Sequence, residues 1–187
     1  MTREKALEML YSYVKTPHIL RHSLAVEAVM KALAIRLNEQ PISDWMLAGL
    51  LHDLDNDEVD WASDMGLHGP KTVEIMKSHE IGNESVYNAI LAHNPENKSQ
   101  IISVLDRALY AADPITGFIN AITLVYPDKK ISSVKVSSIT KRMKEMRFAA
   151  GANRDAMRSI ELLGLSFAEF AELALNAMRE ISDDLEL

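Results

Sequence analysis

An apolar run that ends in a histidine and an aspartate places the strongest constraint on how this chain folds. The run begins at Trp45 and continues through Leu51, and His52 and Asp53 follow it directly. An imidazole and an ionised carboxylate are costly to bury unless they are paired or hold a metal. We therefore expect His52 and Asp53 to project from a buried helix into a site that other histidines and aspartates also reach.

The composition predicts a single helical domain. With 187 residues, the chain is long enough for one well-filled core and too short to require two. The low aromatic content of 6%, the seven glycines and the ten methionines favour helices over a β-sandwich. Helix signals recur throughout, without a convincing strand pair, internal repeat or linker. The predicted fold class is all-α, with one domain over residues 1–187.

Composition also excludes several function classes. The chain has no cysteine, so any metal must be held by His, Asp, Glu or carbonyl oxygen. It has no run of about 18 apolar residues, and its charged N-terminus does not resemble a signal peptide. We therefore expect no membrane span and a cytoplasmic location. The net charge of −7 argues against stable nucleic-acid binding.

One segment departs from the acidic average. Residues 128–158 contain nine Lys and Arg but only three Asp and Glu. We interpret this basic segment as a solvated helix face, and guidance of a phosphorylated small molecule is the alternative.

Periodicity and capping signals place the helices. They are predicted over 3–14, 17–37, 43–53, 70–79, 84–93, 99–112, 134–146 and 153–163, with a last one after residue 166. Ser43 or Asp44 is the expected cap of the helix that carries the doublet. Asp113 is expected at the C-terminal end of its helix, with Pro114 restarting the chain toward residue 125. Ser166 and Glu169 form a capping box.

Four of the six histidines are predicted to face inward. His22 shares a helical stripe with apolar residues, as does His93 on a later helix. His52 ends the apolar run, and His68 stands at a helix start marked by glycine and proline. The remaining two have other interpretations: His18 is predicted on the surface, and His79 near a helix end, where a cation suits the helix dipole.

Four inward imidazoles with Asp53 and Asp113 at helix ends indicate a metal site. Imidazole and carboxylate together suit Mn, Fe, Co, Ni or Zn. A calcium loop starting at Asp53 is the competing interpretation, but Glu58 occupies the position of its required glycine and Asp64 that of its final glutamate. We therefore interpret the remaining acidic residues after the doublet as a solvated loop: Asp55, Asp57, Glu58 and Asp60.

At these residues the chain resembles the HD-domain superfamily of metal-dependent phosphohydrolases, in particular bacterial HDIG-like members. The likeness rests on three segments: His22-Ser-Leu-Ala-Val, Ala48-Gly-Leu-Leu-His-Asp-Leu-Asp and Ala111-Ala-Asp113-Pro. It covers about residues 15–120, and residues 121–187 resemble a helical extension found in some bacterial members. The loop after the doublet departs from the common pattern, because Leu54-Asp55 replaces Ile-Gly.

The resemblance implies an all-α helical bundle that binds one or two divalent metal ions: Fe, Mn, Co, Ni, Mg or Zn. In that pattern His22, His52, Asp53 and Asp113 hold the first ion. His68 and His93 are at suitable places for the second, with Asp53 bridging the two and His79 as the rival for an extra position.

The resemblance further implies that a metal-activated hydroxide hydrolyses a nucleotide or related phosphate ester. The expected partner is therefore a small phosphorylated substrate. Asp53 is the central residue of the predicted catalytic set, and Lys71 and Asp57 are the nearest candidates to assist the leaving oxygen. Two alternatives stay open: a binuclear-iron oxygenase with the same ligands, and a non-catalytic module that binds metal or nucleotide for regulation.

Overall fold

The structure, a computed structural model, describes residues 2–60 and 63–187, and every regular element in these two ranges is helical. This confirms the predicted all-α fold class. The α-helices are α1 (Arg3–Tyr13), α2 (Pro17–Leu37), α3 (Ile42–Leu51), α4 (Pro70–Ser78), α5 (Glu84–His93), α6 (Val104–Val125), α7 (Val136–Arg142), α8 (Arg154–Arg158), α9 (Phe167–Glu180) and α10 (Ser182–Leu185). Short 3-10 helices are found at Met65–Leu67, Pro95–Asn97, Ile131–Ser133 and Ser159–Leu163.

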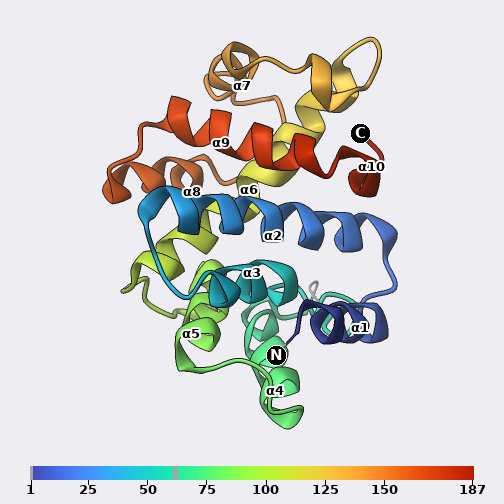
Figure 1. Ribbon diagram of the computed structural model, residues 1–187, viewed down its shortest axis with the longest axis vertical. Coiled ribbons are helices and arrows are strands. Elements are labelled where there is room, and N and C mark those ends of the chain that lie inside the picture. Colours follow the sequence, from blue (N-terminus) through green and yellow to red (C-terminus); the bar gives the residue numbers. More distant parts are fainter. Residues whose placement is uncertain (1, 61–62) are drawn as a thin grey trace.

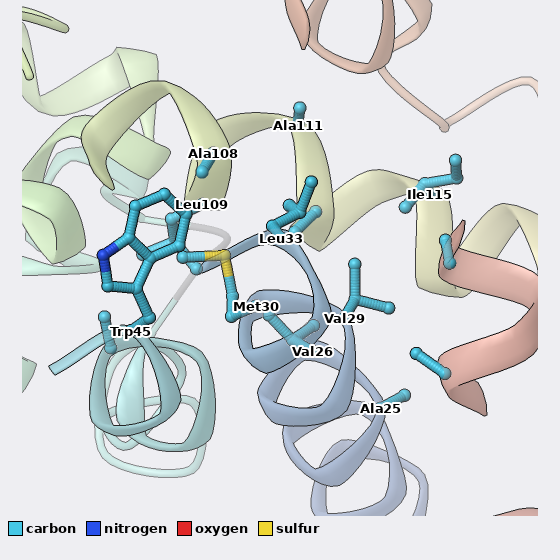
Figure 2. Packing of buried hydrophobic residues seen from close by; sticks show 14 of the residues in the cluster. Ala25, Val26, Val29, Met30, Leu33, Trp45, Ala108, Leu109, Ala111 and Ile115 are labelled. Atoms are coloured by element: carbon cyan, nitrogen blue, oxygen red, sulfur yellow. The ribbon is translucent and has the colours of Figure 1, made fainter. Parts of the chain in front are cut away.

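Helix α2 is the centre of the packing. In Figure 1 it lies between α3 and α9, and α6 crosses it. Its apolar stripe is buried, and Figure 2 shows this stripe against α3 and α6. The side chains in contact there include Val26, Val29, Met30 and Leu33 of α2, Trp45 of α3, and Ala108, Leu109 and Ala111 of α6. Burial of each large apolar side chain contributes about 1.5–3 kcal/mol, so this stripe fixes the positions of the three helices.

A glycine sets how closely α3 approaches α2. A Cβ at Gly49 would lie 2.9 Å from the carbonyl oxygen of Val26 and 3.0 Å from the backbone of Glu27. A side chain at this position would therefore push the two backbones apart. Because Gly49 precedes His52 by one helical turn, this close contact also brings the end of α3 toward His22 on α2.

Helix α6 is continuous through Pro114. The predicted end of this helix near residue 112, with the chain restarting at Pro114, is therefore wrong. Proline in a helix interior removes one hydrogen bond and costs about 3 kcal/mol. Buried side chains on both sides of it, Ala112, Ile115 and Phe118 among them, hold the helix together. Asp113 consequently projects from the middle of a rigid helix. The helix also starts later than expected, at a capping box of Ser103 and Asp106.

The continuous α6 has the length and composition of a membrane-crossing helix, unlike any other helix in the described ranges. No membrane span is predicted from the sequence, because the chain has no run of about 18 apolar residues. A buried core helix passes the same test, and α6 packs against α2, α5 and α8.

The C-terminal helices form the expected extension. Helix α9 packs on α2 and α6, and α10 returns to α2 (Figure 1). The predicted capping box of Ser166 and Glu169 is present at the start of α9. Helix α7 is shorter than predicted, and α8 continues into a 3-10 helix that ends at Gly164, where φ is +81°.

One arginine of the basic segment is buried and fastens a loop. The guanidinium of Arg154 donates hydrogen bonds to the carbonyl oxygens of Glu145, Phe148, Ala149 and Ala152. The interpretation of this segment as a solvated face is therefore wrong for Arg154, which holds the 145–152 loop against the bundle.

Candidate metal centre

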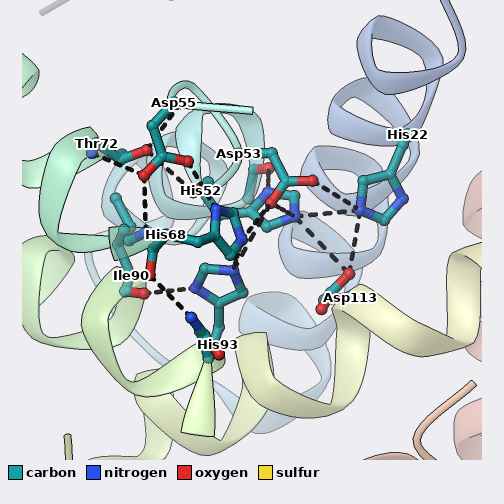
Figure 3. Close-up of polar contacts among 12 residues, drawn as sticks. His22, His52, Asp53, Asp55, His68, Thr72, Ile90, His93 and Asp113 are labelled. Atoms are coloured by element: carbon teal, nitrogen blue, oxygen red, sulfur yellow. Dashed lines mark hydrogen bonds and ion pairs between the residues drawn. The ribbon is translucent and has the colours of Figure 1, made fainter. Parts of the chain in front are cut away.

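Three helices bring the predicted first group of residues together. His22 projects from α2, Asp113 from α6, and His52 caps the end of α3 (Figure 3). Pro41, rather than Ser43 or Asp44, is the residue before α3. The Nε2 atom of His22 lies 3.1 Å from Nε2 of His52 and 3.1 Å from Oδ1 of Asp113. These three ligand atoms are close enough to bind one metal ion.

Asp53 connects this group to a second one. Its Oδ2 lies 3.5 Å from Nε2 of His22, whereas its Oδ1 faces three other imidazoles. The distances from Oδ1 to the Nε2 atoms are 3.3 Å for His52, 3.2 Å for His68 and 3.7 Å for His93. His52, Asp53 and His93 form a second set with metal-binding spacing. The carboxylate of Asp53 thus stands between two adjacent groups.

Hydrogen bonds fix the tautomers of all four imidazoles. Nδ1 of His52 lies 2.8 Å from the carbonyl oxygen of Gly49, and Nδ1 of His93 donates to the carbonyl oxygen of Ile90. A carbonyl can only accept, so in both rings Nδ1 carries a proton, and the neutral form of each ring has its lone pair on Nε2. A hydrogen bond from the ring nitrogen that does not bind the metal is the usual way in which proteins orient metal-binding histidines.

The other two rings follow the same rule. Nδ1 of His68 donates to a carboxylate oxygen at 2.7 Å. Nδ1 of His22 lies 3.1 Å from the hydroxyl of Thr116, whose own proton goes to the backbone oxygen of Asp113. All four Nε2 atoms therefore point into the same small space.

This arrangement tests whether the residues present fit a metal. Nε2 of His68 lies 2.9 Å from Nε2 of His93, and the pair of His22 and His52 is nearly as close. Two lone pairs at such a distance repel unless a cation or a proton lies between them. Neutral imidazoles and carboxylates are the donors that Mn, Fe, Co, Ni and Zn prefer. The donor set therefore fits a divalent metal.

The carboxylate that orients His68 belongs to Asp55. Oδ1 of Asp55 accepts the hydrogen bond from His68, and Oδ2 accepts from the backbone N–H groups of Gly69 and Thr72 at 2.7 and 3.1 Å. Asp55 is fully buried. The interpretation of this residue as part of a solvated loop is wrong: it caps α4 and holds a histidine of the site at the same time.

The electrostatics of the cluster favour ionised carboxylates. Burial opposes ionisation of Asp53, but the charge of His52 and hydrogen bonds from His68 and His93 outweigh it and lower the pKa of Asp53 well below its usual value. Burial acts in the same way on Asp113, whose pKa is lowered by His22 and His52. Burial would lower the pKa of His68, yet the two neighbouring aspartates raise it to about 10. Without a metal, His68 therefore carries a proton on both ring nitrogens at neutral pH, and a metal ion would replace the proton on Nε2, which faces Asp53.

Comparison with protein families matches residues 19–116, slightly more than half of the 187 residues, to the HD domain. The chain belongs to the HD-domain family. Members of this superfamily are generally metal-dependent hydrolases, and HD domains bind divalent metals. No curated protein and no solved structure matches the chain.

In this HD domain the structure also places the two outer histidines as expected. His18 is exposed on α2. His79 follows α4 as its C-cap, and its Nε2 lies 2.9 Å from the hydroxyl of Tyr13. The inward positions predicted for His22, His52, His68 and His93 are confirmed by their burial. Their role as metal ligands stays a prediction.

Lys71 and Asp57 are engaged outside the cluster. Nζ of Lys71 forms an ion pair with Glu74 at 2.9 Å. The carboxylate of Asp57 accepts hydrogen bonds from the backbone N–H groups of Lys15 and Thr16 at 2.6 and 3.0 Å, and from the Thr16 hydroxyl at 2.7 Å. Asp57 thereby fixes the start of α2. A catalytic role for either residue stays a prediction.

Asp55 and Thr116 are partners of the site histidines that were not predicted from the sequence. Thr116 follows Asp113 by one helical turn, so its spacing offered a signal. Asp55 offered none that is local, because its three partners begin thirteen residues later in the chain.

Replacement of Asp57 by alanine is expected to destabilise the protein by about 1 kcal/mol at pH 6, the usual value for such capping hydrogen bonds. Burial opposes ionisation, but the combined hydrogen bonds from Thr16, Lys15 and Asn56 outweigh it and lower the pKa of Asp57 to about 2. Its carboxylate therefore contributes stability above the unfolded-state pKa of about 3.9, and this contribution is lost as pH falls toward 2.

Urea denaturation of both proteins at pH 6, 4 and 2.5 measures this contribution. The difference in free energy of unfolding should shrink as the pH falls. Glu58→Ala is the control, because it removes an exposed carboxylate of the same loop. A difference that stays constant with pH would contradict the assignment.

Proposed function

We propose that this protein is a phosphohydrolase that acts on a nucleotide or related phosphate ester with a pair of divalent metal ions. The observation that carries the proposal is the convergence of four tautomer-fixed Nε2 atoms on the carboxylates of Asp53 and Asp113. His22, His52 and Asp113 would hold one ion, and His68 and His93 the other, with Asp53 shared.

When bound, such ions supply an activated water as nucleophile and polarise a phosphoryl oxygen. The protein contributes rigid positions. Asp53 is held by residues on two sides, and Thr116 orients His22 from the same helix that carries Asp113. Preorganised ligands of this kind need no rearrangement when charge develops in the transition state.

Exposure defines the side from which a substrate approaches. The side chain of Asp113 is 33% exposed and that of His22 is 19% exposed. In contrast, His52, His68 and His93 are each at most 6% exposed. The phosphate ester therefore reaches the cluster at the His22–Asp113 edge, while the His68–His93 side is closed by protein.

A metal-supplemented screen tests this function. Metal-free protein is incubated with Mn, Co, Ni, Mg or Fe(II) and with nucleoside mono-, di- and polyphosphates, cyclic dinucleotides and dinucleoside polyphosphates. We expect turnover of at least one class, abolished by a chelator and restored by metal. Absence of turnover throughout would contradict the proposal, and iron-dependent oxygen consumption would instead indicate an oxygenase.

A further inference from the structure

The packing of α6 does not require the glycine at position 117. Gly117 lies in the interior of α6, one turn after Asp113, and is exposed. A Cβ placed there would meet no atom within 4 Å. Glycine in a helix interior is less favourable than alanine, so the fold gains nothing from this residue. Open space beside a metal-binding cluster instead suits the close approach of a ligand.

Two cavities meet at this glycine. One, of about 360 Å³, lies between α2, α6 and the C-terminal helices, and Arg21 and Asn120 line it. The other, of about 460 Å³, extends from Asp113 and Phe118 to the 149–153 loop. The two cavities share His22 and Gly117 as lining residues. Each therefore opens onto the exposed edge of the metal centre, from a different direction.

The walls of the two cavities differ in chemistry. The first offers two polar groups, the guanidinium of Arg21 and the amide of Asn120. The guanidinium forms an ion pair with Glu186, the residue that follows α10. Helix α10 closes this cavity against α2 (Figure 1). The second is lined mainly by the small residues of the 149–152 loop, which Arg154 fastens through its carbonyl groups. The first suits a polar group and the second a weakly polar one.

We propose that the cleft binds a phosphate diester whose two arms lie in the two cavities, and that Gly117 leaves room for the second arm to pass from one cavity to the other beside the phosphate. This inference rests on the proposed phosphohydrolase function and narrows its substrate class. A phosphate monoester carries one organic arm and would fill only one cavity. In hydrolysis, the oxygen of water joins phosphorus, one P–O bond to an arm breaks, and that arm leaves as an alcohol that carries the displaced proton.

The test compares the wild type with Gly117→Ala and Gly117→Val. Both variants place a side chain in open space, so alanine should raise the Tm by about 1–4 °C and valine should not lower it. Turnover is measured with manganese on bis(4-nitrophenyl) phosphate, a diester, and 4-nitrophenyl phosphate, a monoester. We expect Gly117→Val to lower kcat/KM for the diester at least tenfold and for the monoester less than threefold.

Binding supplies a readout that does not depend on turnover. Calorimetric titration should show tighter binding of diphenyl phosphate than of phenyl phosphate to the wild type, and Gly117→Val should remove the difference. Ser137→Val, at an exposed position of α7 outside both cavities, is the control and should change neither binding nor turnover.

Equal affinity of the wild type for the two phosphates would overturn the inference, as would a Gly117→Val variant that keeps the diester preference. Monoester turnover without a diester preference would leave the phosphohydrolase function in place and remove the two-armed substrate. If no ester is hydrolysed with any metal, the proposed function fails as well.

Discussion

Replacement of His52 by alanine is expected to abolish both metal binding and phosphate-ester turnover, with kcat lowered at least about 1,000-fold. His52 belongs to both groups of residues with metal-binding spacing, so its loss changes the surroundings of either ion. It lies 3.1 Å from Nε2 of His22 and 3.3 Å from Oδ1 of Asp53. Loss of a metal that stabilises transition-state charge costs several kcal/mol, and each 1.4 kcal/mol is about tenfold in rate.

Asp53→Ala should have an equally large effect for a different reason. Its two oxygens face different histidines, so its removal leaves each group one ligand short. The measurement is metal content by mass spectrometry of protein loaded with manganese, iron or zinc, together with turnover. His79→Ala is the matched control, because His79 is exposed and its Nε2 lies against the Tyr13 hydroxyl, outside the cluster and outside both cavities.

Folding must be checked in both variants. His52 is fully buried and its ring is bonded to the carbonyl oxygen of Gly49, so its removal leaves a cavity at the end of α3. Far-UV circular dichroism and Tm separate a folded, metal-free variant from an unfolded one. If folded His52→Ala and Asp53→Ala keep the metal stoichiometry of the wild type, this cluster is not the metal site.

The inward histidines were predictable because their placement depends on local periodicity. His22 and His93 share helical stripes with apolar residues. When such a stripe packs against the core, the residues that belong to it face inward. The position of His68 follows from the glycine and proline that start α4. These signals lie within a few residues of each histidine, so the sequence alone carries them.

What the sequence did not reveal depends on contacts between distant segments. Proline at position 114 predicts a helix break, but burial of its neighbours against α2 and α8 outweighs its local cost. In the same way, the acidic loop after the doublet reads as solvated. Only the return of the chain at Gly69 and Thr72 shows that Asp55 is enclosed by donors. A local sequence pattern contains no information on contacts between segments that are distant in the chain.

Asp55→Asn is expected to remove the metal position at His68 while the fold is retained. Both oxygens of Asp55 accept hydrogen bonds: Oδ1 from His68, and Oδ2 from the N–H groups of Gly69 and Thr72. An asparagine has one oxygen and one NH₂ group. If its oxygen keeps the two backbone donors, its NH₂ group faces Nδ1 of His68, which must then become an acceptor.

The proton of His68 would consequently move to Nε2, the atom that faces Asp53 and His93. A protonated Nε2 cannot bind a metal, because its lone pair is occupied. We expect the affinity of the second metal to fall about 10–100-fold or more, as is usual when the partner of a metal-binding histidine is lost. The bound manganese should drop toward one ion per chain, while Tm changes less than in Asp55→Ala, which leaves three buried donors without an acceptor.

Metal titration by calorimetry and metal analysis after gel filtration measure this effect, and ¹⁵N NMR of the imidazoles reports the tautomer of His68 directly. Asp57→Asn is the matched control: it makes the same substitution two residues later, on a carboxylate bound to Lys15 and Thr16 instead of a histidine. It should lower stability without changing metal stoichiometry. Two tightly bound ions in Asp55→Asn, with Nε2 of His68 still unprotonated, would show that another group sets the tautomer. If Asp55→Asn loses the second ion and Asp57→Asn does not, then Asp55 orients His68 for metal binding. The same result would show that the buried His68–His93 side of the centre binds an ion of its own.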